Sequence, residues 1–361
     1  AAPMTMADAA ARLSHPAYRA DIDGLRAVAV VPVVAFHAFP GWMKGGFIGV
    51  DVFFVVSGFL ITRLMVRERA ATGRISLAAF YARRARRLLP AATIVLLAIV
   101  LASYLLLNPL RAHDTAVDVR WSAGFLANIH FARTGTDYLA SSAAPSMLQH
   151  WWSLAIEEQF YLVWPGLLAG AWALWRRVTA AALVLCGVVV VASFGVGLWL
   201  THENPVWAYF APWSRGWELA AGGLCALVWS LRVQIPGRAV LGWAGLLSVA
   251  IGAVVFDNST AFPGTAALAP VLGTAAVILS IGAAGSPGRL LSVPVAQWVG
   301  GRSYGIYLWH WPLLIIMYDR IDSPSPQWRA GVLLGALALA TISYWLMENP
   351  IRHHPALVRS A

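Results

Sequence analysis

Residues 80–107 read FYARRARRLLPAATIVLLAIVLASYLLL, a block of arginines followed by an apolar run without a single charge. A helix of about 20 apolar residues matches the ~30 Å thickness of the hydrocarbon core of a bilayer. Arginines gather at the cytoplasmic ends of membrane helices. The stretch therefore predicts a transmembrane helix over residues 88–107 that begins at the cytoplasmic face.

The composition of the whole chain extends this prediction. Of 361 residues, 59% are hydrophobic and only 12% are Asp, Glu, Lys or Arg, about half of the ~25% charged fraction that is usual in soluble proteins. Ten membrane helices would use about 200 residues, which is close to the number of hydrophobic residues. The apolar runs are continuous, whereas the strands of an outer-membrane barrel alternate. The sequence thus predicts an all-α, polytopic membrane helix bundle and excludes a soluble enzyme or a disordered chain.

Uncharged runs along the chain predict about ten transmembrane helices. They cover residues 25–41, 49–65, 88–107, 150–175, 178–200, 209–230, 239–256, 265–284, 297–318 and 328–347. Segment 108–149 is mixed in character and holds only a short apolar helix near 115–131. We therefore expect a cytoplasmic segment at 1–24, a membrane domain at 25–348 and a cytoplasmic tail at 349–361.

Arginines and acids alternate from loop to loop along the chain. Residues 66–87 hold seven arginines and a single acid, Glu68, and arginines also follow the fourth, sixth, eighth and tenth spans, whereas the other loops carry Asp or Glu. The positive-inside rule makes the arginine-bearing loops cytoplasmic, which puts both termini in the cytoplasm. The net charge of +10 is then a topology signal, so we expect membrane lipid as a partner and no nucleic acid.

Two ionisable residues in the first span are candidates for chemistry. Arg26 and His37 would share one helix face about 16 Å apart, with Arg26 near the cytoplasmic mouth and His37 well inside the bilayer. A histidine that is merely hydrogen-bonded between helices is the structural alternative, but an ionisable residue inside a membrane favours a functional site. A neutral imidazole can take a proton from a hydroxyl near neutral pH, so His37 is a candidate general base.

The arginine block before residue 88 exceeds what topology or lipid headgroups require. Arg83, Arg84, Arg86 and Arg87 occupy four of five consecutive positions beside aromatic residues. Arginines three apart on a helix present adjacent planar forks to phosphate oxygens. The block therefore predicts a polyphosphate ligand at the cytoplasmic mouth.

Further charged residues lie within the predicted spans. The adjacent Glu157 and Glu158 point about 100° apart on a helix, so we expect that they do not face the same partner and that one of them lines a polar cavity. Arg215 and Glu218, three apart in the sixth span, predict a local ion pair. At the start of the second span, Asp51 predicts a helix cap.

These motifs occur in the order that is typical of the bacterial membrane acyltransferase family 3, which the chain resembles from about residue 19 to 352. The similarity rests on the Arg26–His37 spacing, GVDVFF at 49–54 with GFL at 58–60, the arginine pair, WSL at 152–154 with EEQFY at 157–161, and YLWHWP at 307–312. Members of this family O-acylate glycans and lipids of the cell envelope, commonly with acetyl groups from acetyl-CoA. The resemblance implies a multi-pass protein of a bacterial inner membrane.

The resemblance also implies roles for individual residues. His37 matches the family's essential histidine, Arg26 its paired arginine and Glu157 the first glutamate of its span-four motif. The donor-linked arginine pair matches Arg84 and Arg87, although Arg83 and Arg86 satisfy the same spacing and leave both registers open. We assign to substrate binding the remaining polar and aromatic motif residues, which are Asp51, Ser57, Trp152, Glu158 and His310.

One motif points to a branch of the family. Residues 134–139, TGTDYL, resemble members that are fused to a periplasmic SGNH-type hydrolase domain. Two alternatives stay open: the membrane domain works alone, or a further helix and a periplasmic domain follow it. Cys186 and Cys225 lie in apolar stretches without metal-ligand spacing, so we expect no metal.

The expected mechanism combines the charge pattern with the resemblance. The charged nucleotide of cytosolic acetyl-CoA cannot cross hydrocarbon cheaply, so the arginines would hold its phosphates while its arm reaches His37. His37 would take the proton of a hydroxyl on an envelope glycan or glycolipid that arrives from the outer side, and Glu157 would orient the imidazole or stabilise its protonated form. An acyl-histidine intermediate is the alternative chemistry. A proton-coupled transporter of a small or lipid-linked solute is the alternative function, since intramembrane His, Glu and Arg also form proton relays.

Overall fold

The computed structural model describes residues 19–39, 41–136, 138–139, 145–174, 178–231 and 233–353. The elements of these residues are all helical, with no strand among them. In chain order they are α2 (Ala20–Ala38), η1 (Gly46–Ile48), α3 (Gly49–Thr72), α4 (Leu77–Leu106), α5 (Pro109–Ala123), α6 (Ala127–Arg133), α7 (Trp151–Leu174), α8 (Val178–Glu203), α9 (Pro205–Phe210), α10 (Pro212–Ser230), α11 (Arg238–Val255), α12 (Leu268–Ser280), α13 (Gly288–Leu291), α14 (Pro294–Arg320), α15 (Pro326–Ser343), η2 (Tyr344–Glu348) and α16 (Asn349–His353).

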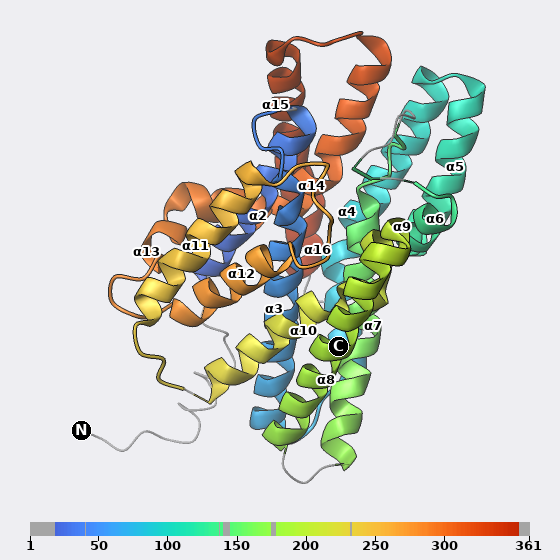
Figure 1. The fold of residues 1–361 in the computed structure, drawn as a ribbon. Helices are drawn as coiled ribbons and strands as arrows, with labels where there is room; N and C mark the ends of the chain where they lie inside the picture. Colours follow the sequence, from blue (N-terminus) through green and yellow to red (C-terminus); the bar gives the residue numbers. More distant parts are fainter. Residues whose placement is uncertain are drawn as a thin grey trace.

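The long helices form an elongated bundle (Figure 1). The turn between α4 and α5 and the connection between α14 and α15 lie at its upper end in this view, and the C-terminal end of α3 lies at the lower end. An antiparallel pair, α11 and α12, packs along one side, where Gly242 lies against Ser280 and Gly245 against Gly273.

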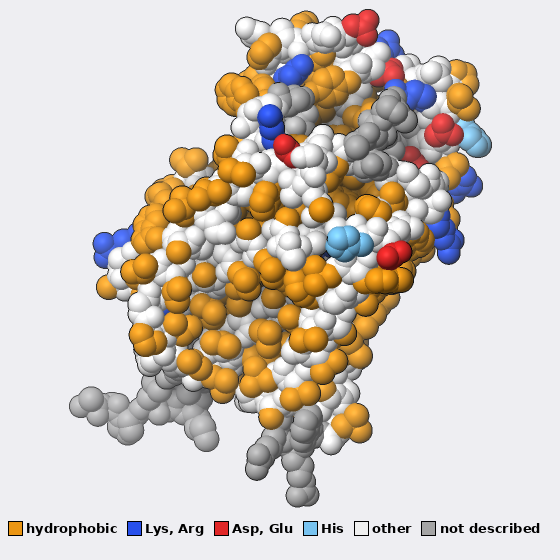
Figure 2. All heavy atoms as spheres, in the orientation of Figure 1, with side chains coloured by type: hydrophobic (Ala, Val, Ile, Leu, Met, Phe, Trp, Pro, Cys, Tyr) orange, Lys and Arg blue, Asp and Glu red, His pale blue; other side chains and the backbone are white. Residues whose placement is uncertain are grey.

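The surface of the bundle confirms an all-α membrane protein. Among the described residues, five helical segments are long and apolar enough to cross a membrane: Gly46–Thr72, Leu77–Leu106, Thr179–Glu203, Arg238–Val255 and Pro326–Ile351. Only 28% of the apolar window in Thr179–Glu203 and 17% of that in Pro326–Ile351 is buried inside the protein. Hydrophobic side chains accordingly cover the middle of the visible face, while charged side chains gather toward its upper end (Figure 2). Lipid solvates such a surface, whereas water does not.

Helix α4 begins earlier than the apolar pattern predicts. We expected the third span to start at residue 88, but the helix starts at Leu77 and its first turn is capped by the Ser76 hydroxyl, which accepts from the Ala79 N–H over 3.2 Å. The arginines therefore lie on the helix itself and not on a loop. Hydropathy locates the part of a helix in hydrocarbon, while the capping residue locates its end.

Two predicted segments are each interrupted by a break between helices. The short helix expected near 115–131 is divided into α5 and α6, with Phe125 between them in a left-handed conformation (φ 53°). The sixth span, expected over 209–230, corresponds to α10 for nearly all of its length, but its first two residues end the separate short helix α9, and the break lies at Ala211. Proline has no N–H to continue a helix, and Pro212 follows at the first position of α10, where that loss costs nothing.

Two parallel helix pairs position the interior residues. Helix α14 approaches α2 so closely that a Cβ on Gly300 would lie 1.7 Å from the Asp23 carbonyl oxygen. Helix α10 approaches α3 in the same way, since a Cβ on Gly58 would lie 1.8 Å from the Leu219 carbonyl oxygen. Small residues permit such contacts between membrane helices. The polar side chains of α2 and α14, and those of α3 and α10, are therefore held at fixed depths relative to each other.

Candidate active site

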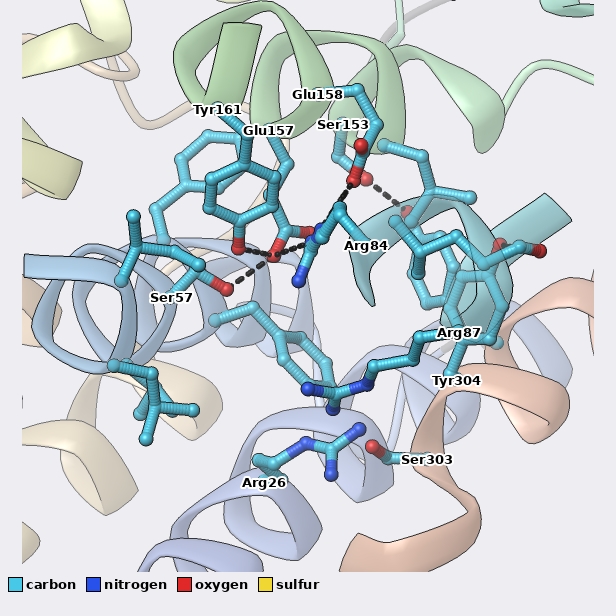
Figure 3. A pocket seen from close by; sticks show the side chains of 18 of the residues that line it. Arg26, Ser57, Arg84, Arg87, Ser153, Glu157, Glu158, Tyr161, Ser303 and Tyr304 are labelled. Atoms are coloured by element: carbon cyan, nitrogen blue, oxygen red, sulfur yellow. Dashed lines mark hydrogen bonds and ion pairs between the residues drawn. The ribbon is translucent and has the colours of Figure 1, made fainter. Parts of the chain in front are cut away.

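A cavity with both apolar and charged walls lies inside the bundle between α2, α3, α4, α7 and α14 (Figure 3). Apolar side chains of α3 form one wall, and most of the remaining lining is polar or charged. The polar lining residues are Arg26, Ser57, Arg84, Arg87, Ser153, Glu157, Glu158, Tyr161, Ser303, Tyr304 and Tyr307. We refer to this space as the arginine cavity.

Arg84 joins both glutamates of α7. Its Nη2 donates to Glu158 Oε1 over 2.9 Å and lies 3.6 Å from Glu157 Oε1, and its guanidinium carbon is 3.6 Å from the centroid of the Tyr161 ring. The expectation that the two glutamates cannot face one partner is thus wrong. Two side chains that leave their own helix in different directions can still meet the end of a long side chain from a neighbouring helix, and here the single Nη2 atom of Arg84 lies near both carboxylates.

Glu157 makes its contacts inside the arginine cavity. Its Oε1 accepts hydrogen bonds from the hydroxyls of Ser57 and Tyr161, in addition to the Arg84 contact. The expected pairing of Glu157 with the His37 imidazole is wrong, because both ring nitrogens of His37 bond to other residues. The position of a residue in a sequence motif does not determine which neighbouring helix its side chain reaches.

The structure distinguishes the two arginine registers. Arg84 and Arg87 line the arginine cavity, and Arg87 points toward Arg26 of α2 and Ser303 of α14 (Figure 3). Arg83 instead forms an ion pair with Glu68, with a distance of 3.1 Å between Nη2 and Oε2, and Arg86 is not part of the lining. Arg26 also contacts Asp23, over 3.3 Å.

A second hollow adjoins the arginine cavity and shares Arg26, Leu60, Arg87 and Tyr304 with it. Its other charged lining residues are Arg19, Asp23, Arg63, Arg302 and Glu348, so cations outnumber carboxylates. We call this hollow the basic mouth. Our sequence reasoning missed Arg63 and Arg302, although both lie inside predicted spans, where a charge is itself a signal of function.

His37 lies outside the arginine cavity in a buried aromatic cluster. Its Nδ1 is 2.9 Å from His310 Nε2, its Nε2 is 2.8 Å from the Tyr138 hydroxyl, and the Trp311 ring centroid is 4.4 Å from its own. The side chain is 8% exposed. His310 thus contacts His37 directly, and Tyr138, from the TGTDYL motif, is a contact that our sequence reasoning did not assign.

Two hydroxyls connect the arginine cavity with the histidine cluster. Tyr307 and Ser153 line the cavity, and their oxygens are 2.7 Å apart. The Tyr307 hydroxyl also donates to the His150 carbonyl over 2.9 Å, and its ring centroid lies 5.5 Å from that of His310. Arg26 in the cavity and His37 in the cluster are on the same helix, α2, as the spacing predicts.

Asp51 and Trp152 belong to a different buried group. Asp51 Oδ1 is 3.0 Å from Arg215 Nη2, and Arg215 Nε is 2.6 Å from Glu218 Oε1, which confirms the predicted ion pair within α10. The three charged side chains are completely buried, and Trp152 lies 5.5 Å from the Arg215 guanidinium. Asp51 therefore links α3 to α10 and does not cap α3, contrary to the expectation. Neither Asp51 nor Trp152 lines the arginine cavity.

Comparison of the sequence with known proteins places the chain in a family. A family model described as an acyltransferase domain matches residues 19–348. Among curated relatives, the peptidoglycan O-acetyltransferase OatA of Listeria monocytogenes is 32% identical over 93% of this chain and 56% of its own length. The putative peptidoglycan O-acetyltransferase YrhL of Bacillus subtilis is 34% identical over 94% and 56%, and the O-acetyltransferase OatA of Staphylococcus aureus is 30% identical over 94% and 58%. The chain thus spans a little over half the length of these relatives, and no solved structure matches it.

Proposed function

Because the chain belongs to this acyltransferase family, we propose that it is an O-acetyltransferase that transfers acetyl groups from cytosolic acetyl-CoA to a hydroxyl of an envelope glycan on the outer side of a bacterial inner membrane. The relatives named as acting on peptidoglycan support a cell-wall glycan as the acceptor. The loop arginines support a cytoplasmic position for residues 74–87 and for both ends of the chain.

The observation that carries the proposal is the continuity between the basic mouth and the arginine cavity. The two spaces share Arg26 and Arg87, so an elongated ligand can have its anionic end in one and an uncharged arm in the other. Acetyl-CoA has this division, with phosphates on its nucleotide and an uncharged pantetheine arm. We assign the phosphates to Arg26, Arg87, Arg63 and Arg302. Arg84 is engaged with two carboxylates and instead fixes the cavity wall.

His37 is the general base in this proposal. Its Nε2 faces the Tyr138 hydroxyl at 2.8 Å, a distance at which an imidazole can take a proton from an alcohol. An acceptor hydroxyl in the same position would lose its proton to Nε2 while its oxygen bonds to the thioester carbonyl carbon. The carbon–sulfur bond then breaks, and the CoA thiolate leaves and takes up a proton. The arm would reach His37 past Tyr307 and Ser153, which lie between the cavity and the cluster.

Calorimetry with purified protein in detergent tests this function. Acetyl-CoA should bind, and a desphospho analogue should bind more weakly because fewer phosphates reach the arginines. Transfer of radiolabelled acetyl groups to a glycan acceptor should require the donor and an intact His37. Absence of acetyl-CoA binding by folded protein would contradict the assignment of the basic mouth.

A further inference from the structure

His310 contacts the proposed base but lines neither the arginine cavity nor the basic mouth. It lies on α14, one turn beyond Ile306, and its side chain is completely buried. Its two ring nitrogens have different partners: Nδ1 is 3.0 Å from the Ile306 carbonyl oxygen, and Nε2 is 2.9 Å from His37 Nδ1. These two partners determine where the protons lie.

The proton positions follow from the backbone. A carbonyl oxygen can only accept, so His310 Nδ1 must carry the proton and donate it to Ile306. In a neutral His310 the Nε2 atom then has a lone pair and accepts the Nδ1–H of His37. A neutral His37 that has its proton on Nδ1 has none on Nε2, which accepts from the Tyr138 hydroxyl. None of these partners is a carboxylate, so nothing in the chain of bonds offsets the cost of a buried imidazolium.

We propose that His310 is a positioning residue that holds His37 in the tautomer whose Nε2 has a lone pair, which accepts from Tyr138 in the structure and would accept from the acceptor hydroxyl during transfer. The inference rests on the proposed function, in which His37 is the base. His310 takes the place that a carboxylate has in a hydrolase triad, because it orients the base through the nitrogen that does not react. When His37 gains a proton at Nε2, its Nδ1–H bond to His310 becomes charge-assisted and strengthens.

Close packing keeps the two rings in register. Helices α2 and α14 are parallel and touch at Gly300 and Asp23, and the rings of His37 and His310 stack with an interplanar angle of 12° and a centroid distance of 5.2 Å. The lone pair of His310 is therefore available to His37 without movement of either helix.

A matched pair of variants, His310→Phe and His150→Phe, tests the proposal. Each removes a completely buried histidine of the same cluster, and the ring centroids of His150 and His310 are 5.7 Å apart. Of these two histidines, only His310 bonds to His37, since the ring nitrogens of His150 make no hydrogen bond among the described residues. His310→Gln is the conservative variant, because its amide oxygen can accept the His37 Nδ1–H.

Two readouts apply to these proteins: nitrogen-15 NMR of the labelled histidine side chains, with the His37 signals identified by their loss in His37→Ala, and the transfer rate with saturating substrates. In the wild type and in His150→Phe, His37 should have its proton on Nδ1. In His310→Phe we expect mixed tautomers and a kcat lower by about 100-fold or more, since a base in the wrong tautomer costs up to ~10⁴ in a serine-protease triad. The KM for acetyl-CoA should stay within about twofold because His310 is remote from the phosphate sites, and His310→Gln should restore part of the rate.

An unchanged His37 tautomer in folded His310→Phe, or equal loss of rate in His150→Phe, would overturn the proposal. The NMR readout does not depend on activity. Absence of acetyl transfer by the wild type would refute the proposed function, and full transfer by His37→Ala would exclude His37 as its base, while in both cases the tautomer measurement still decides whether His310 orients His37.

Discussion

The guanidinium of Arg84 and the carboxylate of Glu158 form a largely buried ion pair of 2.9 Å between α4 and α7. Both side chains are less than one-fifth exposed, and Oε1 of Glu157 lies 3.6 Å from the same Nη2 atom of Arg84. An arginine with two carboxylate partners and an aromatic ring against its face has little capacity left for a ligand phosphate. Arg84 and Arg87 therefore differ in their capacity to bind a ligand, although the sequence motif presents them as equivalent.

Arg84→Ala should therefore act on stability. It leaves two carboxylates buried without their partner, a change that typically costs about 3–5 kcal/mol. Thermal unfolding in detergent should show a clear fall in Tm for Arg84→Ala and little change for Arg83→Ala, whose ion pair with Glu68 is more exposed. Equal Tm values for the two variants would show that the α4–α7 pair is not structural.

Arg87→Ala should weaken the binding of acetyl-CoA. Loss of one charged hydrogen bond to phosphate corresponds to about 1.5–3 kcal/mol, which is ~10- to 150-fold in the Kd for acetyl-CoA measured by calorimetry. Added salt should weaken wild-type binding because charges at the open mouth are screened, and Arg87→Lys should rescue only partly because an ammonium lacks the planar fork. Arg83→Ala is the control, and a comparable loss of affinity in it would favour the other register.

His37→Ala should abolish transfer but retain donor binding. His37 lies outside the arginine cavity, so its removal leaves the phosphate contacts intact. Removal of a general base costs about 10²–10⁴-fold in rate. Parallel measurement of acetyl-CoA affinity and of acetyl transfer checks both halves of the expectation, and near-normal transfer would exclude His37 as the base.

Glu157→Gln should impair the interaction with acetyl-CoA and leave the proton position on His37 unchanged. Glu157 accepts from Ser57 and Tyr161 and contacts Arg84 in the cavity wall, so a neutral amide loosens the wall that faces the pantetheine arm. We expect a higher KM for acetyl-CoA and an unchanged His37 tautomer. A pure loss of kcat together with a changed tautomer would restore the direct Glu157–His37 coupling that the sequence suggested.

Much of the bundle could be predicted because a helix that crosses lipid needs a long, continuous apolar stretch. Apolar length locates α7 and α8 to within a few residues, and loop arginines indicate a direction for each helix. The start of α4 at Leu77 and the break at Ala211 follow from capping and proline chemistry, which hydropathy does not register. Capping residues and prolines can be recognised in the sequence when helix ends are predicted separately from apolar runs.

The sequence identified many residues of the site but not which of them contact one another. Sequence spacing places Arg26 and His37 on one helix and singles out Glu157 and His310. It cannot show that His37 meets His310, 273 positions away, instead of Glu157. Such pairs depend on which helices pack together and at what depth, and here a few glycines fix that depth.

Gly300 is the glycine at the contact between α14 and α2. Gly300→Ala should destabilise the protein, because its Cβ would lie 1.7 Å from the Asp23 carbonyl oxygen and would force α14 away from α2. Overpacking in a rigid core costs typically about 1–3 kcal/mol, and the displaced α14 would also move His310 relative to His37. Gly301→Ala is the matched control: its Cβ would meet no atom within 4 Å, and alanine is a better helix former by ~1 kcal/mol. Thermal unfolding should therefore show a lower Tm for Gly300→Ala and an equal or higher Tm for Gly301→Ala. Because Gly301 lines the basic mouth, the two variants are compared by Tm alone. The transfer rate should also fall in Gly300→Ala, and equal Tm values of the two variants would mean that contact between α2 and α14 does not set the register of the histidine pair.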